Sequence, residues 1–259
     1  MSEKKIILSA ENITVGYQEK IVASELNFQL TEGKLIGLIG ANGIGKSTLL
    51  KTISGILRPI SGEIFIENQN LHNISPKQLS RKISLVLTEK LPLSNLTVFE
   101  VVALGRHPYT NWLGTLSEED LAQTNLALQI TQIEHLAQKK YFEISDGQLQ
   151  KVLIARTLAQ NTPLIILDEP TTHLDLQHKI LTLKLLQDLA KNQQKTILFS
   201  THDLELALQM CDEIMLMTPD FFEINSPKNL IKNNRLDYLF KDENIFFDKE
   251  KEKFVFKNF

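Results

Sequence analysis

Apolar and polar positions along this chain alternate between strand and helix patterns. Apolar runs occur at 35–39 (LIGLI), at 164–167 (LIIL) and within 195–200 (KTILFS), as in strands buried on both faces of a parallel sheet. A segment with helical spacing at 175–192 separates the last two runs. This alternation predicts an α/β fold with a mostly parallel central sheet.

The amino-terminal part has a different pattern. Its short apolar runs before residue 35 are separated by turns near 18–20 and 31–33, and another strand pattern, GEIFIEN, follows at 62–68. Short strands joined by tight turns are typical of antiparallel sheets. We therefore expect an antiparallel sheet beside the parallel core.

Between Leu96 and Ala159 the pattern becomes helical. The segments with helical spacing are 96–106, 117–132 and 144–156. In the second, Ser117 is placed as the cap and Asp120 in the first turn. The third, ISDGQLQKVLIAR, opens on small and polar residues, and such a helix start offers free N–H groups and the positive end of a dipole to an anion. The stretch predicts a helical insert in the α/β core.

Composition narrows the class of protein. The 259 residues are 42% hydrophobic and 23% charged, which is typical of a folded globular protein. The formal net charge of −3 shows no excess of positive charge of the kind that binds nucleic acid. The apolar runs are too short for a membrane span or a secretory signal, so we expect a soluble cytoplasmic protein. The single cysteine, Cys211, lies among apolar residues and is expected to pack in the core.

The segment GANGIGKST at 40–48 fits the pattern G-x-x-x-x-G-K-[ST] between a buried strand and a helix. Glycines let the backbone wrap closely around phosphate with its N–H groups pointing inward. Lys46 is then placed to bridge the β- and γ-phosphates, and the Ser47 hydroxyl to hold Mg²⁺. The residues predicted to bind ATP in this loop are Asn42, Gly43, Gly45, Lys46, Ser47 and Thr48.

Two further segments place catalytic side chains at the ends of buried strands. Asp168 and Glu169 follow the run LIIL, at the edge where a doubly wound sheet binds its ligand. Asp168 can complete the Mg²⁺ shell, and Glu169 can polarise the water that attacks the γ-phosphate. His202, in STHD after the next strand, is placed on the same edge, where it could contact the γ-phosphate or orient the water.

With these motifs the chain resembles the ATP-binding subunits of ABC transporters, over about residues 4–230. In that family ISDGQ at 144–148 takes the place of the signature sequence, THLD at 172–175 that of the loop after the acidic strand, and Tyr17 that of the aromatic residue stacking on adenine. The resemblance implies an ABC-type P-loop NTPase core with a mostly parallel sheet, an antiparallel β subdomain and a helical subdomain. A GTPase or small-molecule kinase would share the phosphate loop but would have no use for ISDGQ.

The same resemblance implies domain boundaries. Residues 1–228 would form the ATP-binding domain, with the helical subdomain inserted at about 90–158. Residues 229–259 would be a C-terminal extension of unknown role. Within it, IFFD at 245–248 and KFVF at 253–256 predict either a small terminal hairpin or a partly frayed tail.

In that family two copies pair head to tail. The helix beginning near Ser145 would then address the γ-phosphate of ATP held by the partner's GANGIGKST loop. The residues implied to bind the partner's ATP are Ser145, Gly147, Gln148 and Asp175. The implied cofactors are ATP and Mg²⁺, with ATP holding the homodimer together and hydrolysis releasing it.

Two positions depart from the family pattern. Asp146 stands where the signature usually has a second glycine, which brings a carboxylate close to a polyphosphate. We expect Asp146 to turn back and cap its own helix, leaving Ser145 and the Gly147 backbone to meet phosphate. The family's usual glutamine ligand falls at Thr88, so either Glu89 substitutes as a Mg²⁺ ligand or Thr88 acts through an extra water.

The segments at 96–120 and 158–179 look most like ATPase subunits that import iron–siderophore complexes, haem or cobalamin. The resemblance implies a peripheral protein on the cytoplasmic side of the inner membrane, docked on two permease subunits, with an extracytoplasmic substrate-binding protein delivering cargo. The alternatives are an ABC exporter subunit and a soluble ABC ATPase outside transport.

A groove between the core and the helical insert would receive the permease. Candidates for its wall are Leu91–Thr97 and the loop at 105–114, with Tyr109 and Trp112. The alternative is that these aromatic side chains pack inside the insert.

Overall fold

A central six-stranded sheet organises the computed structural model, which describes residues 5–17, 20–87, 94–172, 174–240, 244–251 and 253–256. The strand order is β10-β9-β3-β8-β7-β6. The strands are β3 (Leu35–Gly40), β6 (Ile83–Val86), β7 (Leu164–Leu167), β8 (Thr196–Ser200), β9 (Glu213–Met217) and β10 (Phe222–Asn225). All neighbours are parallel except β10, which runs antiparallel to β9 at one edge. The predicted mostly parallel sheet is confirmed, and the carboxyl ends of β3, β7 and β8 meet at one edge.

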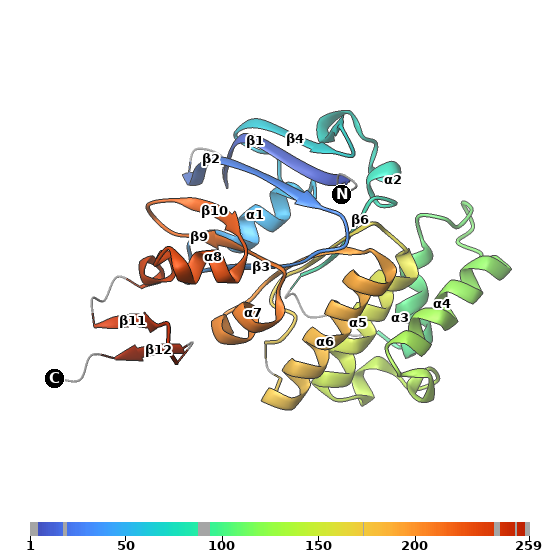
Figure 1. Cartoon of the computed structure of the whole chain (residues 1–259). Helices are drawn as coiled ribbons and strands as arrows, with labels where there is room; N and C mark the ends of the chain where they lie inside the picture. The colour runs from blue at the N-terminus through green and yellow to red at the C-terminus, as the bar shows by residue number, and fades with distance from the viewer. Residues whose placement is uncertain are drawn as a thin grey trace.

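A four-stranded antiparallel sheet in the order β2-β1-β4-β5 lies beside this core. Its strands are β1 (Ile6–Tyr17), β2 (Lys20–Thr31), β4 (Ser61–Ile66) and β5 (Gln69–Asn70). Figure 1 shows α1 (Lys46–Ile53) between the two sheets. One hydrophobic cluster joins apolar side chains of both sheets to Leu49, Leu50 and Ile53 of α1. The expected antiparallel sheet is therefore confirmed, and it shares a core with the helix that follows the phosphate loop.

Three helices occupy the predicted helical insert: α3 (Val98–Ala103), α4 (Glu118–Ile130) and α5 (Asp146–Gln160). Ser117 caps α4 as expected, and its hydroxyl and backbone N–H both donate to the Asp120 carboxylate. Asp120 in turn accepts from Arg106 Nε at 2.8 Å, and this ion pair is almost wholly buried. Because Arg106 also donates to the Ala159 carbonyl, one side chain ties α4 to the end of α5.

The remaining helices complete the layers around the sheets. They are α2 (Pro76–Leu79), α6 (Leu176–Gln193), α7 (Leu204–Met210) and α8 (Pro227–Lys232), with short 3₁₀ turns η1 (Leu71–Asn73), η2 (Leu104–Arg106), η3 (Glu134–Leu136), η4 (Tyr141–Glu143) and η5 (Arg235–Leu239). The larger hydrophobic cluster joins the central sheet to α3, α5, α6 and α7 and includes Cys211. Burial raises the pKa of the Cys211 thiol, consistent with the expected core role. Among the described residues, none of the helices combines the length and apolar character that a membrane crossing requires.

The last described elements are a hairpin of β11 (Ile245–Asp248) and β12 (Lys253–Phe256), which Figure 1 shows below α8. The rings of Phe240, Phe247 and Phe254 pack edge to face, and the Phe247 N–H donates to the Asp237 carboxylate. Of the two interpretations of the carboxyl-terminal sequence, the hairpin is the one observed.

Candidate functional site

The glycine-rich loop joins the end of β3 to the start of α1. Gly45 has φ +113°, and a Cβ at this position would lie 2.2 Å from Val22 Cγ1, so only glycine fits. Gly45 is also the residue before α1, and no side chain caps the first N–H groups of that helix. These donors are therefore directed at the loop, where an anion can accept from them.

Lys46 is held within this loop. Its Nζ donates to the Gly40 carbonyl at 2.9 Å and to the Ala41 carbonyl at 3.2 Å. Burial lowers the pKa of Lys46, and the negative charges of Glu169 and Asp168 oppose that shift. The ammonium group is thus held among backbone carbonyls and faces two carboxylates at the carboxyl edge of the sheet.

An open cleft of about 410 Å³ lies over the loop. It is lined by Val22, Asn42, Gly43, Gly45, Lys46, Ser47, Thr48, Glu169 and His202. The six predicted loop residues and both predicted catalytic residues are thus brought together from three separate segments. Tyr17, at the end of β1, is about half exposed and is not among the residues that line the cleft.

The acidic pair follows β7 with two different environments. Asp168 is buried, whereas the Glu169 side chain reaches the cleft. One Glu169 carboxylate oxygen lies 2.6 Å from His202 Nε2, and the other accepts from the Thr172 hydroxyl at 3.0 Å. With Glu169 ionised, His202 Nε2 must carry the proton of this hydrogen bond. The predicted neighbours Glu169 and His202 are therefore in direct contact.

The amino end of α5 differs in one respect from expectation. Ser145, not Asp146, is the cap: its hydroxyl accepts from the Gln148 N–H at 3.3 Å, while the Ser145 N–H donates to the Gln148 side chain at 3.0 Å. Asp146 is the first helical residue and is exposed, so the expectation that it caps the helix is wrong. The physical reason is position: a cap needs extended backbone one residue before the helix, and Ser145 has it.

Asp175 caps α6 and lies near the start of α5. Its carboxylate accepts from the His178 N–H at 2.8 Å and contacts His178 Nδ1 at 2.9 Å, and these two hydrogen bonds hold the pKa of Asp175 below its usual value. A Cβ at Gly147 would lie 3.3 Å from the His178 ring. His178 is not among the residues predicted from sequence, although its position three residues after a capping aspartate was a signal.

The residues predicted to serve a partner's nucleotide share one surface of the chain. His178 links Asp175 to Gly147, and Gly147 lies between Ser145 and Gln148. Among the described residues lining the phosphate-loop cleft, none comes from 145–148 or 175. Within one chain, the start of α5 therefore does not contribute to the cleft.

A sequence profile described as "ABC transporter" matches residues 23–172, more than half of the chain. The chain belongs to the ABC transporter ATP-binding family. It is an ATP-hydrolysing protein of the ABC type. The matched segment contains GANGIGKST, ISDGQ and the acidic pair at 168–169, whereas Tyr17, Asp175 and His202 lie outside it.

Relatives and solved structures agree with this assignment. The iron(3+)-hydroxamate import ATP-binding protein of Bacillus subtilis is 40% identical over 77% of this chain and 74% of its own length. A chain of an ABC transporter described as metal-chelate type, in an inward-facing conformation, superposes with a TM-score of 0.80 at 31% identity over 96% of this chain and 95% of its own. A dimeric post-hydrolysis ATP-binding cassette bound to ADP and phosphate has a TM-score of 0.72 at 28% identity over 85% of this chain and 99% of its own.

This ABC ATPase has a donor set that suits Mg²⁺. The Ser47 hydroxyl lines the cleft, and the buried Asp168 carboxylate belongs to the same edge of the sheet. Magnesium prefers oxygen ligands and usually takes only one or two from the protein, with the rest from substrate phosphates and water. Accordingly, no cluster of three or more His, Cys, Asp or Glu side chains suited to a metal occurs among the described residues. Thr88 and Glu89, the two candidates for an additional ligand, lie outside the described residues.

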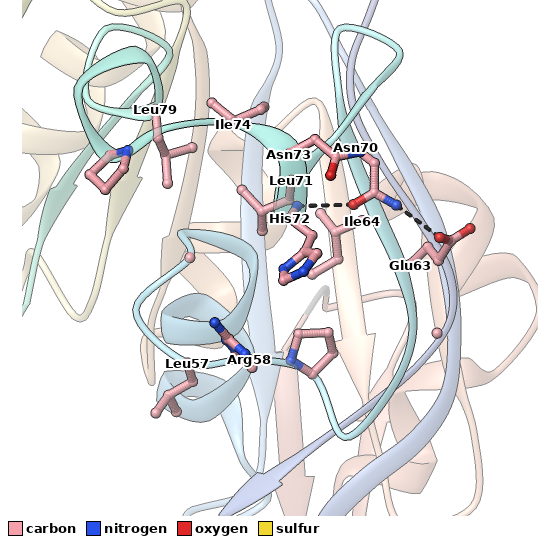
Figure 2. Close-up of a pocket in the computed structure, with 14 residues that line it drawn as sticks. Leu57, Arg58, Glu63, Ile64, Asn70, Leu71, His72, Asn73, Ile74 and Leu79 are labelled. Carbon is pink, nitrogen blue, oxygen red and sulfur yellow. Dashed lines mark hydrogen bonds between the residues drawn. The ribbon is translucent and has the colours of Figure 1, made fainter.

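The ABC ATPase has a second and larger cavity, of about 680 Å³, away from the phosphate loop (Figure 2). It lies between the segment that follows α1 and the elements β4, β5, η1 and α2. Figure 2 shows the His72 ring turned toward the segment that carries Arg58, while Glu63 is held by Asn70 at the rim. The rest of the lining is largely apolar, with Ile64, Leu71 and Leu79 among it.

The two aromatic candidates for a permease groove have different environments. The Tyr109 ring lies under the guanidinium groups of Arg106 and Arg81, and its hydroxyl donates to the Gln160 carbonyl at 3.0 Å. For Tyr109, packing within the insert is therefore the observed role. Trp112 is 91% exposed. Of the other candidate segment, residues 91–93 lie outside the described residues.

Proposed function

We propose that this chain is the ATPase subunit of an importer for an iron chelate, haem or cobalamin. The proposal is supported by the names of the relatives, which include a hydroxamate-iron importer, and by the structural likeness to a metal-chelate type transporter. In this role ATP binding and hydrolysis by a homodimer drive uptake through a membrane permease.

We further propose that two copies sandwich ATP head to tail. The observation that carries this proposal is that Ser145, Gly147, Gln148 and Asp175 form a surface that the chain's own phosphate-loop cleft does not use. The start of α5 has backbone N–H groups for an anion, and a second chain can supply the triphosphate that meets them. The similar cassette that is dimeric and bound to ADP and phosphate supports the formation of a dimer.

Within each cleft the side chains have separate roles in this proposal. Lys46 and the loop N–H groups neutralise the β- and γ-phosphates, and Tyr17 stacks on adenine. Ser47 and Asp168 would hold Mg²⁺, which supplies positive charge to the phosphate oxygens when bound. Glu169 polarises the attacking water, and His202 holds the Glu169 carboxylate in place at 2.6 Å.

The domain organisation follows from these roles. Residues 1–228 form the ATP-binding domain with the helical subdomain at about 90–158, and residues 229–259 form an extension.

The proposed location of the protein is peripheral, at the cytoplasmic side of the inner membrane, with an extracytoplasmic substrate-binding protein delivering cargo to the permease.

For the permease, the proposed docking surface lies where the insert meets the core. Arg81, after α2, donates to the Pro108 carbonyl at 3.0 and 3.2 Å and so joins the two parts there. The loop that begins at Pro108 carries the exposed Trp112 and Leu113, and the α2 residues Pro76 and Leu79 line the 680 Å³ cavity. Exposed apolar side chains such as these are typical of protein-binding surfaces.

The test is reconstitution with the membrane permease that this proposal requires as a partner. The proposal predicts a stable complex whose ATP hydrolysis rises when a binding protein loaded with iron chelate, haem or cobalamin is added. A matched control is the complex with the unloaded binding protein. If the complex forms but moves substrates out of vesicles instead, the importer assignment is wrong and the exporter alternative holds.

A further inference from the structure

Ser200, the last residue of β8, joins the two acids of the site. It is fully buried, with 0% of its surface exposed. Its hydroxyl donates to Asp168 Oδ1 at 2.6 Å and accepts from the Glu169 N–H at 2.8 Å. A single hydroxyl therefore contacts the side chain of one acid and the backbone of the next.

The end of the β7–β8 ladder explains this contact. The two strands pair in parallel as far as Leu167 and Phe199, so residues 168 and 200 are the next to face each other. At that point the chain leaves β7, and the Ser200 side chain provides the partner for the Glu169 N–H. The Ser200 hydroxyl thus takes the place of the next backbone acceptor in the ladder, and it does so beside Asp168 and Glu169.

The contact between Ser200 and the Glu169 N–H stabilises an unusual backbone conformation of Glu169. Its φ is +51°, a left-handed conformation that side chains with a Cβ disfavour. This turn brings the Glu169 carboxylate to His202. Because the Ser200 hydroxyl binds the N–H of the same residue, it stabilises the conformation in which Glu169 faces the cleft.

We propose that Ser200 is a positioning residue for ATP hydrolysis, and that its hydroxyl fixes the distance and orientation between Asp168 and Glu169. This inference rests on the proposed roles of Asp168 with Mg²⁺ and of Glu169 with the attacking water. A side chain without a hydroxyl leaves a buried carboxylate oxygen and a buried N–H without this partner. Both acids then gain freedom to leave the productive geometry, although neither is altered chemically.

The experiment uses Ser200→Ala and Ser200→Cys in the full chain. Cysteine fills the volume but is a weak donor, so it removes the hydroxyl without opening a cavity. The matched control is Ser84→Ala: Ser84 is also fully buried, on β6, but it accepts from the Thr162 hydroxyl at 3.0 Å near the amino ends of the strands, away from the site. The measured quantities are kcat and KM for ATP, the Mg²⁺ concentration that gives half-maximal rate, ATP binding in the presence of EDTA, and the melting temperature.

For both Ser200 variants we expect kcat to fall about 10- to 100-fold, the range typical for loss of a partner that orients a ligand. The KM for ATP and binding in EDTA should change less than about twofold, since the phosphate loop is untouched, while the Mg²⁺ requirement should rise. The control Ser84→Ala should have a lower melting temperature than the wild type but the same kcat.

The proposal is overturned if either folded Ser200 variant keeps the wild-type kcat and Mg²⁺ requirement. Should Ser200→Ala fail to fold, Ser200→Cys alone decides between the two results. Glu169→Gln in the otherwise unchanged chain separates this outcome from failure of the site assignment. If Glu169→Gln hydrolyses ATP at the wild-type rate, the role proposed for Glu169 is wrong, regardless of the result for the Ser200 variants.

Discussion

His202 Nε2 and the Glu169 carboxylate lie 2.6 Å apart at the carboxyl edge of the central sheet, in the cleft over the phosphate loop. His202 comes from the segment after β8 and Glu169 from the segment after β7, so parallel pairing of neighbouring strands brings them together. The hydrogen bond orients the group that we propose to polarise water.

The first prediction concerns this pair. His202→Ala should lower kcat for ATP hydrolysis about 100-fold, near the lower end of typical acid–base contributions, with little change in KM. Steady-state kinetics measure both quantities. His72→Ala, which alters an exposed histidine of the other cavity, is the control and should keep the wild-type kcat. A His202→Ala enzyme with unchanged kcat would show that Glu169 does not need this partner.

The second prediction concerns the glycines of the phosphate loop. Both Gly43→Ala and Gly45→Ala place a Cβ on a positive φ, but only at Gly45 does the Cβ meet an atom, Val22 Cγ1 at 2.2 Å. The melting temperature should therefore fall several degrees further for Gly45→Ala than for Gly43→Ala. In chains of about this length, a loss of about 1 kcal/mol in the free energy of unfolding lowers the melting temperature by about 2–4 °C. Differential scanning calorimetry gives the comparison. Val22→Ala should restore part of the loss in a double variant, and equal losses for the two glycines would contradict the packing argument.

The third prediction concerns the buried pair Arg106 and Asp120. Asp120→Asn leaves a buried guanidinium without its charge partner and should reduce the free energy of unfolding by about 3–5 kcal/mol at pH 7. Urea denaturation measures it. Glu118→Gln, an exposed first-turn change in the same helix, should cost less than about 1 kcal/mol.

The same pair predicts a pH dependence. Burial alone would raise the pKa of Asp120, but the hydrogen bonds from Ser117 and the Arg106 guanidinium outweigh it and hold the pKa below its usual value. A lowered pKa in the folded state means that this stabilisation is complete above about pH 4, the pKa of an unfolded aspartate, and is lost as pH falls through the folded pKa. Below pH 4 the wild type should therefore lose stability more steeply than Asp120→Asn. Parallel curves for the two proteins would exclude an ionised Asp120.

Much of this architecture follows from sequence because the patterns are local. The run 35–39 and the glycines after it specify a buried strand and a phosphate loop, and the structure adds only Gly40 to that strand. Ser117 is the cap of α4 because a serine before three acidic residues satisfies the free N–H groups of a helix start. The buried strand, the phosphate loop and the Ser117 cap could therefore be inferred from spacing alone.

Two kinds of feature were harder to infer: the choice between adjacent cap residues, and contacts between distant segments. The capping role expected for Asp146 falls to Ser145, which is decided by backbone angles at one residue. Ser200 was not identified because its contacts with Asp168 and Glu169 depend on where the β7–β8 ladder ends. The contact of His178 with Gly147 was missed because Gly147 lies in another helix. For Tyr109 the sequence left open a groove wall or packing inside the insert, and only the structure shows two arginines from different segments covering its ring.

The fourth prediction concerns Asp146. Because this exposed carboxylate is not used as a cap, it adds negative charge where a partner's triphosphate is proposed to bind. Asp146→Asn should strengthen ATP-dependent dimerisation about three- to tenfold, the range given by roughly 1 kcal/mol of repulsion in a largely aqueous site. Sedimentation at several protein concentrations gives the dimer affinity. The gain should shrink at high salt, which screens exposed charges, and the control Glu119→Gln on α4 should have no effect. An unchanged affinity would mean that Asp146 faces away from the nucleotide.

In the proposed dimer each ATP is held between two copies, by the phosphate loop of one and the start of α5 of the other. Light scattering on Glu169→Gln saturated with Mg·ATP tests it most directly, because a chain that binds but does not hydrolyse ATP should accumulate in the closed state. The account predicts a dimer that disappears when Lys46→Ala is added. A Glu169→Gln protein that binds Mg·ATP yet stays monomeric, both alone and in complex with its permease, would contradict the account.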